Sequence, residues 1–392
     1  MKDLLRALAR PRLTGSKGAQ EVADIIHERL TELGYEIQDH PFTFSTWPGR
    51  FAMSIAGLIF LAGTLGAAAL LNMRHPGMSL VILSVALLIV AAITVLTPVV
   101  TNILPFGRIT ANNMFAARPK AIPRFIFMAH LDSKSQPVPL AFRGPAIILA
   151  LLAWLAFAIF ATLALLDPVY IRPEITTLLG VIAFIAGVLL VFCWVENRSP
   201  GALDNASGVA TVLALAESEK DRDDVAFLIT DAEELGLVGA RSIARKLNPV
   251  FGVINIDGVD DSGPIYVLEK FGVPPRHIAP HLVAAILSAA DAQQIPAQRR
   301  NVPFGLMVDH LPIARADLPA VTVMRGSFAS LRRVHRPADN MDRMSGTGIE
   351  TVANVLRDAL ARLREDAATT MRAVKGAAAA VRKSSEAERS RL

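Results

Sequence analysis

The chain contains four long apolar segments, Ala52–Leu71, Met78–Val100, Ala146–Leu166 and Ile175–Val195, none of which holds an Asp, Glu, Lys, Arg or His. Each has about 20 residues, and a helix of that length crosses the roughly 30 Å hydrocarbon core of a bilayer. Buried helices of soluble proteins are the alternative, but four such uncharged runs in one chain argue against it. The pattern therefore predicts four transmembrane helices.

Short connections join these segments in two pairs, over residues 72–77 and 167–174. Because each helical hairpin returns the chain to the side where it began, we expect the remaining stretches to lie together on one side of the membrane. The predicted organisation is one globular domain formed by residues 1–50, 101–144 and 196–366, hairpin 1 at 51–100, hairpin 2 at 145–195, and a basic, flexible tail at 367–392.

Outside the hairpins, short apolar runs bounded by polar residues predict buried strands. These runs cover residues 124–131, 225–230, 253–256 and 320–324. Helical patterns lie between or around them, at residues 15–33, 206–218, 235–247, 280–290 and 346–363. Strands that alternate with helices are typical of α/β folds. We therefore expect a three-layer sandwich with a mostly parallel central sheet, interrupted by the four transmembrane helices in two hairpins.

The composition limits the kinds of functional site that this domain can contain. Hydrophobic residues make up 52% of the 392 positions and charged residues 19%, which agrees with a membrane protein. The single cysteine, Cys193, excludes both an internal disulfide and a thiolate zinc cluster, so any metal must be held by His, Asp or Glu. The net charge of +5 is modest and the arginines are dispersed, which disfavours nucleic-acid binding. The charged N-terminus, without a long apolar core, does not resemble a signal peptide.

Acidic and imidazole side chains gather where the predicted strands end. His130 and Asp132 close the first strand, the pair Glu233 and Glu234 follows the second, and Asp257 closes the third. Ligand-binding groups of parallel sheets collect at the carboxyl ends of the strands. A ligating histidine also commonly donates its second ring N–H to a carboxylate, a role for which Asp132 is suitably spaced.

Each of these residues also has a simpler explanation when taken alone. Asp204 stands at the start of a helical pattern, where an aspartate commonly caps the helix. Glu233 and Glu234 could be two solvated acids that favour the positive end of a helix dipole. His335, in a loop before the last helix, could be an ordinary surface histidine.

In chain order, however, the motifs resemble one family. They are His130-x-Asp132, Gly201-Ala-x-Asp204-Asn-x-Ser-Gly, Asp231-Ala-Glu-Glu-x-Gly-Leu-x-Gly, Asn255-x-Asp257 and the loop histidine His335. This arrangement resembles metallopeptidase family 28, which includes the co-catalytic di-zinc aminopeptidases. The stretch Val308-Asp309-His310 also resembles a family motif, with Val308 where serine is usual. The resemblance covers most of the chain outside the apolar segments.

The resemblance implies a zinc aminopeptidase-like fold, two zinc ions per chain and a peptide substrate with a free N-terminus. It implies that His130 and Asp257 bind one zinc ion, that Glu234 and His335 bind the other, and that Asp204 bridges them. It also implies that Glu233 is the general base and that Asp132 orients His130. The expected activity is zinc-dependent hydrolysis of peptide bonds that removes N-terminal residues.

Three other functions remain open at this point. A non-proteolytic zinc amide hydrolase or a glutaminyl cyclase-like enzyme would use similar chemistry. A catalytically silent membrane receptor is disfavoured because all the implied ligands are present. A transporter component is disfavoured because the apolar segments hold no ionisable His, Asp, Glu, Lys or Arg.

The charges beside the apolar segments predict sidedness. Four arginines flank the segments on the side of the globular domain (Arg50, Arg108, Arg143 and Arg198), whereas the two opposite loops hold only Arg74 and Arg172. Positive charge in short flanks favours the cytoplasmic face. We therefore expect a multi-pass protein of the bacterial inner membrane with a cytoplasmic catalytic domain; the sequence leaves the oligomeric state open.

Overall fold

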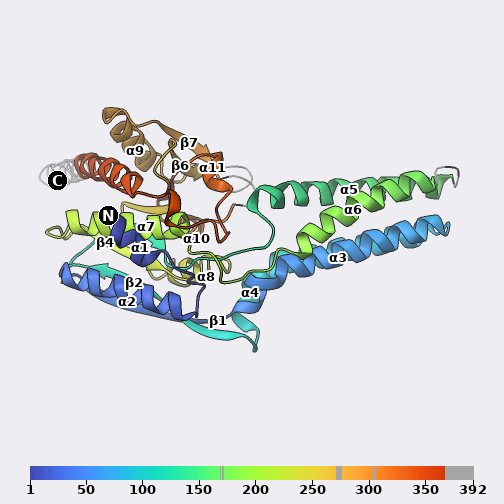
Figure 1. Ribbon diagram of the computed structural model, residues 1–392, viewed down its shortest axis with the longest axis horizontal. Helices are drawn as coiled ribbons and strands as arrows, with labels where there is room; N and C mark the ends of the chain where they lie inside the picture. Colours follow the sequence, from blue (N-terminus) through green and yellow to red (C-terminus); the bar gives the residue numbers. More distant parts are fainter. Residues whose placement is uncertain (168, 170–171, 271–275, 303–305, 367–392) are drawn as a thin grey trace, which may run out of the picture.

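The computed structural model describes residues 1–167, 169, 172–270, 276–302 and 306–366, so the predicted tail at 367–392 lies outside the described residues. Figure 1 shows an α/β domain at one end, from which four long helices project side by side. The inner ends of these helices all meet the same end of the α/β domain. The chain therefore leaves this domain and returns to it twice.

An eight-stranded mixed sheet forms the centre of the domain, in the order β1-β2-β4-β3-β5-β8-β6-β7. The strands are β1 (Glu36–Ser45), β2 (Arg108–Ala117), β3 (Phe125–His130), β4 (Val225–Thr230), β5 (Gly252–Val259), β6 (Ile265–Lys270), β7 (Ala297–Asn301) and β8 (Ala320–Arg325). The four central strands β4, β3, β5 and β8 are parallel, as are β6 and β7. The contacts β1–β2, β2–β4 and β6–β8 are antiparallel. The expected mostly parallel sheet therefore holds for the centre and for β6–β7, and the sheet as a whole is mixed.

Helices cover both faces of the sheet because successive side chains of a strand point to opposite faces. On β3, Phe125 and Phe127 pack into one apolar cluster, whereas Ile126 and Met128 pack into another. The first cluster includes residues of α1 (Lys2–Leu8), α2 (Lys17–Glu32), α7 (Ser207–Ser218), α9 (Pro280–Ala292) and the helix at residues 347–366. The second includes residues of α8 (Val238–Ile243) and α10 (His310–Arg315). The domain thus has three layers.

Two departures from the sequence-based expectation have local causes. The predicted helix at 235–247 is reduced to α8, because Ala232 and Leu237 both adopt left-handed backbone angles (φ 58° each) and form a tight turn before it. Strands β1, β2, β6 and β7 were not predicted. Most positions of β1 are half-buried or exposed, since it lies at the edge of the sheet, so it lacks the apolar run of a central strand.

The four apolar segments form helices long and apolar enough to be candidate membrane spans. They are α3 (Thr46–Asn72), α4 (Pro76–Ile103), α5 (Leu140–Leu166) and α6 (Pro173–Val191). Large apolar side chains point outward from them; Leu88 is 68% exposed and Val95 is 72% exposed. Where the helices touch, small residues allow close approach. A Cβ on Gly63 of α3, for example, would lie 2.6 Å from the Cβ of Ala86 in α4.

Candidate metal centre

The predicted ligands come from five separate segments that meet above the carboxyl ends of neighbouring strands. His130 is the last residue of β3, and β3 lies between β4, which leads to Glu234, and β5, which contains Asp257. Asp204 lies in the short turn η2 (Ala202–Ala206) before α7. His335 follows α11 (Phe328–Leu331) in a loop, with a left-handed φ of 62°.

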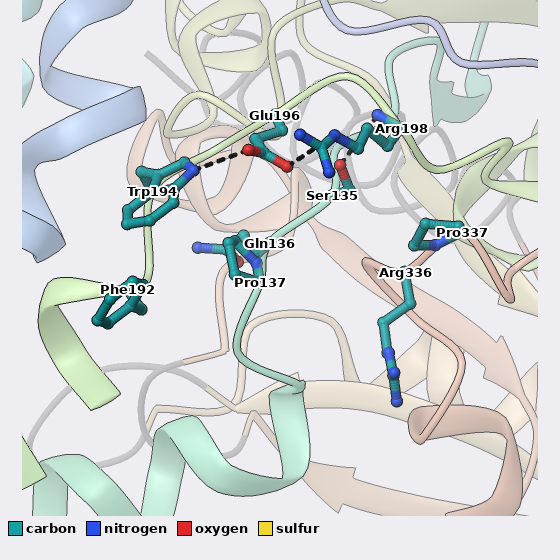
Figure 2. Close-up of a pocket in the computed structure, with 9 residues that line it drawn as sticks. All are labelled: Ser135, Gln136, Pro137, Phe192, Trp194, Glu196, Arg198, Arg336 and Pro337. Atoms are coloured by element: carbon teal, nitrogen blue, oxygen red, sulfur yellow. Dashed lines mark hydrogen bonds and ion pairs between the residues drawn. The ribbon is translucent and has the colours of Figure 1, made fainter. Parts of the chain in front are cut away.

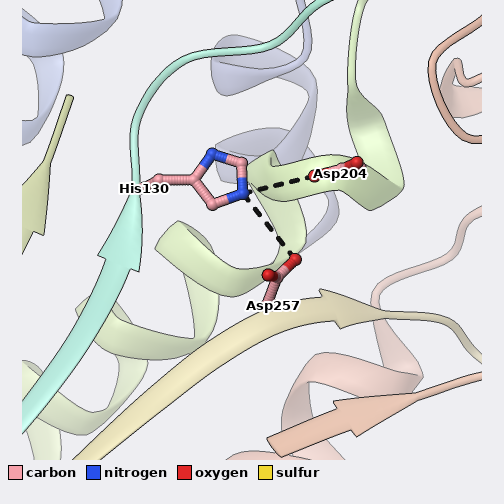
Figure 3. A group of neighbouring side chains, drawn as sticks. All are labelled: His130, Asp204 and Asp257. Atoms are coloured by element: carbon pink, nitrogen blue, oxygen red, sulfur yellow. Dashed lines mark ion pairs between the residues drawn. The ribbon is translucent and has the colours of Figure 1, made fainter. Parts of the chain in front are cut away.

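These side chains form two groups that share one carboxylate. His130, Asp204 and Asp257 make the first group, which Figure 3 shows converging, and Asp204, Glu234 and His335 make the second. The Nε2 atom of His130 lies 3.3 Å from Oδ1 of Asp204 and 3.7 Å from Oδ1 of Asp257. The Nε2 atom of His335 lies 3.1 Å from Oδ2 of Asp204 and 3.3 Å from Oε2 of Glu234. The two oxygens of Asp204 therefore face different histidines.

The residues that follow Asp204 fasten its turn to β5. The Asn205 side chain donates to the carbonyl of Ile256 (2.9 Å) and accepts from the backbone N–H groups of Gly208 and Gly258 (3.0 Å each). A Cβ on Gly208 would lie 2.1 Å from Oδ1 of Asn205, so only glycine fits there. This explains the Asp-Asn-x-Ser-Gly spacing physically, because it fixes Asp204 beside the strand that carries Asp257.

Asp132 holds the two glutamates in place through the backbone. Its carboxylate accepts the N–H groups of Glu233 and Glu234, each at 3.1 Å. The Nδ1 atom of His130 lies closer to the Asp132 carbonyl (3.1 Å) than to its carboxylate (3.5 Å). Asp132 therefore contacts both His130 and the turn that presents Glu233 and Glu234.

The glutamates differ in their affinity for protons. Burial raises the pKa of the Glu233 carboxyl well above its usual range, and the neighbouring charge of Glu234 adds to this effect. Burial acts in the same direction on Glu234, but Lys134 and His335 outweigh it and lower its pKa to about 2. The centre thus holds one carboxyl that retains protons next to one that stays ionised, a division typical of acid–base sites.

Two buried residues that sequence reasoning missed hold the loops of the centre. The fully buried guanidinium of Arg12 donates to the carbonyl oxygens of Leu131 (2.6 Å), Pro200 (2.5 Å) and Gly201 (2.9 Å). Burial lowers its pKa to about 10. No motif marks Arg12 in the sequence, because these three carbonyl partners are more than 100 residues away.

The second missed residue is Asp339, whose carboxylate accepts the backbone N–H groups of Leu203 (2.8 Å) and Asp204 (3.0 Å). Burial raises the pKa of Asp339 to about 6. In the sequence, its position four residues after His335 was the feature that could have indicated a place beside the centre. Asp339 and Arg12 together fix the turn that carries Asp204.

Two cationic side chains, also missed, touch the second group. The Nζ atom of Lys134 lies 2.6 Å from Oε2 of Glu234. An Nη atom of Arg143, in the first turn of α5, lies 2.7 Å from Nδ1 of His335. Lys134 directly follows the first motif and Arg143 precedes an apolar segment, so neither position indicated a contact with a ligand.

The stretch Val308-Asp309-His310 lies beneath the centre. All three residues are buried, and the His310 ring is bonded to the Thr322 hydroxyl at 2.6 Å. Burial lowers the pKa of His310 to about 3. Asp309 accepts from the hydroxyl of Thr230, the last residue of β4, at 2.5 Å. This stretch therefore bonds the end of β4 and the interior of β8, and it lies outside the two groups.

A cleft of about 420 Å³ lies where hairpin 2 meets the His335 loop. Figure 2 shows Phe192 and Trp194 on one side of it, and Arg336 and Pro337 on the other. The backbone N–H of Gln136, a lining residue, donates to the carbonyl of His335 at 3.0 Å. The cleft therefore adjoins the second group.

The donor set fits zinc, since neutral imidazole and carboxylate oxygens are common zinc ligands. The buried Nε2 atom of His130 makes no hydrogen bond and faces the two carboxylates of its group. A buried polar atom without a partner is costly. A cation between His130, Asp204 and Asp257 would satisfy that atom and balance the two negative charges.

Comparison with known proteins agrees with this geometry. Residues 175–360 match the model of peptidase family M28. A protein of Acetivibrio thermocellus named "Putative aminopeptidase" is 26% identical over 148 residues, which cover 35% of this chain and 44% of that protein. The match thus spans less than half of that relative.

Solved structures share the fold along nearly the whole chain. Glutaminyl cyclase of Porphyromonas gingivalis has a TM-score of 0.55 at 15% identity, with 92% of this chain and 95% of that chain covered. A leucine aminopeptidase precursor of Bacteroides thetaiotaomicron has a TM-score of 0.54 at 13% identity, with 91% and 93% covered. These likenesses show a mixed α/β fold with a central sheet, and the matched family model supports peptidase family M28.

Proposed function

We propose that this chain is a zinc-dependent aminopeptidase anchored in a membrane by two helical hairpins. The observation that carries the proposal is the pair of ligand groups that share Asp204 at the ends of parallel strands. The family match supports peptidase chemistry. The substrate we propose is a peptide with a free N-terminus, for which the cleft beside His335 offers room.

Each residue has a proposed role. His130 and Asp257 would hold one zinc ion, Glu234 and His335 would hold the other, and Asp204 would be shared. The Asp132 carbonyl would keep the Nδ1 proton of His130 in place. The Asp132 carboxylate would position Glu233 by accepting the backbone N–H of Glu233. Arg12 and Asp339 would keep the Asp204 turn in register with β5.

Zinc, when bound, polarises a peptide carbonyl and makes a water molecule easier to deprotonate. Glu233 takes the proton from that water and delivers it to the nitrogen of the leaving amine. Its raised pKa favours this exchange, because a group that both accepts and returns a proton works best with a pKa near the operating pH. Glu234, which stays ionised, serves as a ligand instead.

Glutaminyl cyclase-like activity is the second candidate, because the fold is as similar to that of a glutaminyl cyclase as to that of an aminopeptidase. The two reactions differ in their products. A cyclase releases ammonia from an N-terminal glutaminyl peptide, whereas an aminopeptidase releases free glutamine from it.

The decisive experiment uses purified full-length protein, stripped with a chelator and then reloaded with zinc. We expect it to release reporter groups from a panel of aminoacyl substrates only after reloading. Zinc-loaded protein that cleaves none of them would contradict the proposal, and ammonia release from a glutaminyl peptide would favour the cyclase.

We also propose that the α/β domain faces the cytoplasm, on the basis of the arginines that flank the spans on its side. A reporter that fluoresces only in the cytoplasm, fused after Leu392, should fluoresce. A dark fusion with an active periplasmic reporter at the same position would reverse the orientation.

A further inference from the structure

The Nδ1 atoms of the two histidines of the centre have hydrogen-bond partners of opposite kind, an acceptor in one case and a donor in the other. The Nδ1 atom of His130 lies 3.1 Å from the carbonyl oxygen of Asp132. A carbonyl can only accept, so Nδ1 carries the ring proton and Nε2 is left with a free lone pair. That lone pair faces Asp204 and Asp257. His130 is therefore held in the tautomer that binds a metal through Nε2.

His335 is held the other way. Its Nδ1 atom lies 2.7 Å from an Nη atom of Arg143. A guanidinium has only donors, so Nδ1 must accept and the ring proton of the neutral histidine lies on Nε2. Nε2 is the atom that faces Asp204 and Glu234. A protonated nitrogen has no lone pair for a metal, so this tautomer cannot act as the ligand that the second group requires.

Hairpin 2 fixes Arg143 in this position. Arg143 lies in the first turn of α5, is 7% exposed, and also donates to the side-chain oxygen of Gln136. The amide of Gln136 donates in turn to the carbonyl of Cys193, just beyond the end of α6, at 2.7 Å. The backbone N–H of Gln136 donates to the His335 carbonyl at 3.0 Å. Both helices of hairpin 2 are thus connected to the His335 loop.

A second cation reinforces the difference between the groups. Lys134 lies 2.6 Å from the Glu234 oxygen that faces His335. Each ligand unique to the second group therefore contacts a cationic side chain. Among the described residues, no Lys or Arg forms an ion pair or hydrogen bond with the side chains of His130 or Asp257, the ligands unique to the first.

We propose that Arg143 acts as a latch on the second metal position: it holds His335 in the tautomer that cannot ligate, and an ion enters only when the guanidinium leaves Nδ1. The ring then releases its Nε2 proton to water and takes one on Nδ1, so its charge does not change. This inference rests on the metal centre of the proposed function. It makes the first position fill before the second, and it couples the second to the base of hairpin 2.

Zinc titration of the purified, metal-free full-length protein against a competing chelator tests the latch without using activity. The wild type should bind one zinc ion tightly and a second at least about tenfold more weakly, the range over which partners of metal ligands change affinity. Arg143→Gln supplies a side-chain oxygen that accepts the Nδ1 proton. It should strengthen binding of the second ion by about tenfold and leave the first unchanged.

Two control variants separate the latch from a general effect of altering a hairpin. Arg143→Lys retains only donors and should leave the second affinity close to that of the wild type. Arg50→Gln removes another arginine at a hairpin base. Its side chain bonds a backbone carbonyl at 3.4 Å and lies over the Phe51 ring, and it touches no residue of either ligand group, so the change should alter neither affinity. Weaker or unchanged binding of the second ion in Arg143→Gln would overturn the latch.

A measurement on the wild type keeps the test decisive if Arg143→Gln does not fold. Nitrogen chemical shifts of labelled histidine in the metal-free protein, assigned with His335→Asn, should show His335 protonated at Nε2. Protonation at Nδ1, or two equally tight zinc ions, would overturn the latch but leave the proposed function intact. Failure to bind any zinc would remove both.

Discussion

The α/β domain and the four-helix bundle bury different kinds of side chain. The core of the domain contains large residues such as Phe127, Phe227 and Ile254, together with buried charged groups such as Arg12 and Asp132. The main cluster inside the bundle is built largely from alanines, with Leu71, Leu83 and Phe157 as its large members, while leucines and valines point outward. Outward apolar residues suit a lipid solvent, where packing of small residues replaces the hydrophobic effect as the main source of helix association.

This difference indicates that the domain positions the charged groups of the metal centre, whereas the bundle mainly packs helices together. The domain can bury charge because its loops supply hydrogen-bond partners, as they do for Arg12 and Asp132. The buried positions of the bundle form close helix contacts. Within the described part of the chain, the bundle hydrogen-bonds a side chain of the metal centre at its base, where Arg143 contacts His335. Substitutions at the metal centre of the domain should therefore affect activity, whereas substitutions inside the bundle should affect stability alone.

The largest effect is expected from Asp204→Ala. The shared carboxylate belongs to both ligand groups, so its removal should abolish binding of both zinc ions and reduce peptidase activity below detection. Metal analysis of chelator-free protein measures this directly, with the exposed acid variant Asp24→Ala as the control. Retention of one full zinc equivalent in Asp204→Ala would show that the two groups do not depend on a shared ligand.

The next effect concerns Glu233→Gln, which should preserve the zinc content and lower kcat by about 10²–10⁴-fold, the usual contribution of a general base. The adjacent variant Glu234→Gln is the matched comparison and should lose zinc instead, because Glu234 belongs to a ligand group. Zinc content and kcat measured on both variants separate the roles. Wild-type turnover in zinc-loaded Glu233→Gln would exclude it as the base.

Within the bundle, Gly63→Ala should lower stability and leave kcat unchanged. Its new Cβ would lie 2.6 Å from the Cβ of Ala86, and relieving such overpacking costs about 1–3 kcal/mol. Gly180→Ala is the matched control, because no atom of another helix lies within 4 Å of its new Cβ. Thermal inactivation in detergent should occur at a lower temperature for Gly63→Ala only. Equal behaviour of the two variants would contradict close packing of α3 against α4.

The smallest effect is expected at the far side of the domain, for Arg364→Met. Arg364 donates to Asp224 and Glu219 at 2.7 Å. Burial raises the pKa of Asp224, but the contact with Arg364 outweighs burial and lowers it. A carboxyl whose pKa is lower in the folded state stabilises the protein above its unfolded pKa of about 3.9 and loses that contribution as pH falls. We expect a loss of about 1 kcal/mol at pH 7 that fades towards pH 3.

Unfolding of metal-free protein at both pH values measures the Arg364 effect. The exposed variant Arg357→Met, whose arginine bonds only to Asn354 of its own helix, is the control. A loss in Arg364→Met that is as large at pH 3 as at pH 7 would mean that packing, and not the ion pair, causes it.

The sequence indicated the proposed ligands because their signals are local. Each ligand stands beside the end of an apolar run or inside a short motif, and the geometry of parallel strands brings such ends together. His130, Glu234 and Asp257 are examples, since β3, β4 and β5 are adjacent. Asp204 and His335 lie on loops, and the family resemblance rather than periodicity pointed to them.

The remaining features depend on contacts between distant parts of the chain. Arg143 and His335 are 192 positions apart, and Arg12 and Gly201 are 189 apart, so no local pattern marks either pair. Strands β1 and β2 escaped prediction because each is flanked by a long apolar helix and neither is an apolar run itself. The predicted helix at 235–247 begins within the turn Ala232–Leu237, whose left-handed residues prevent a helix there.

The order of the segments along the chain has a consequence for biosynthesis. A ribosome makes β3, which carries His130, before hairpin 2, and it makes the Asp204 turn and β4 after it. Yet β4 lies between β2 and β3 in the sheet, so the strand that joins them appears only after both hairpins have been made. Synthesis of both hairpins therefore precedes completion of the sheet, and neither group of proposed ligands can assemble in the nascent chain until the second hairpin has left the ribosome.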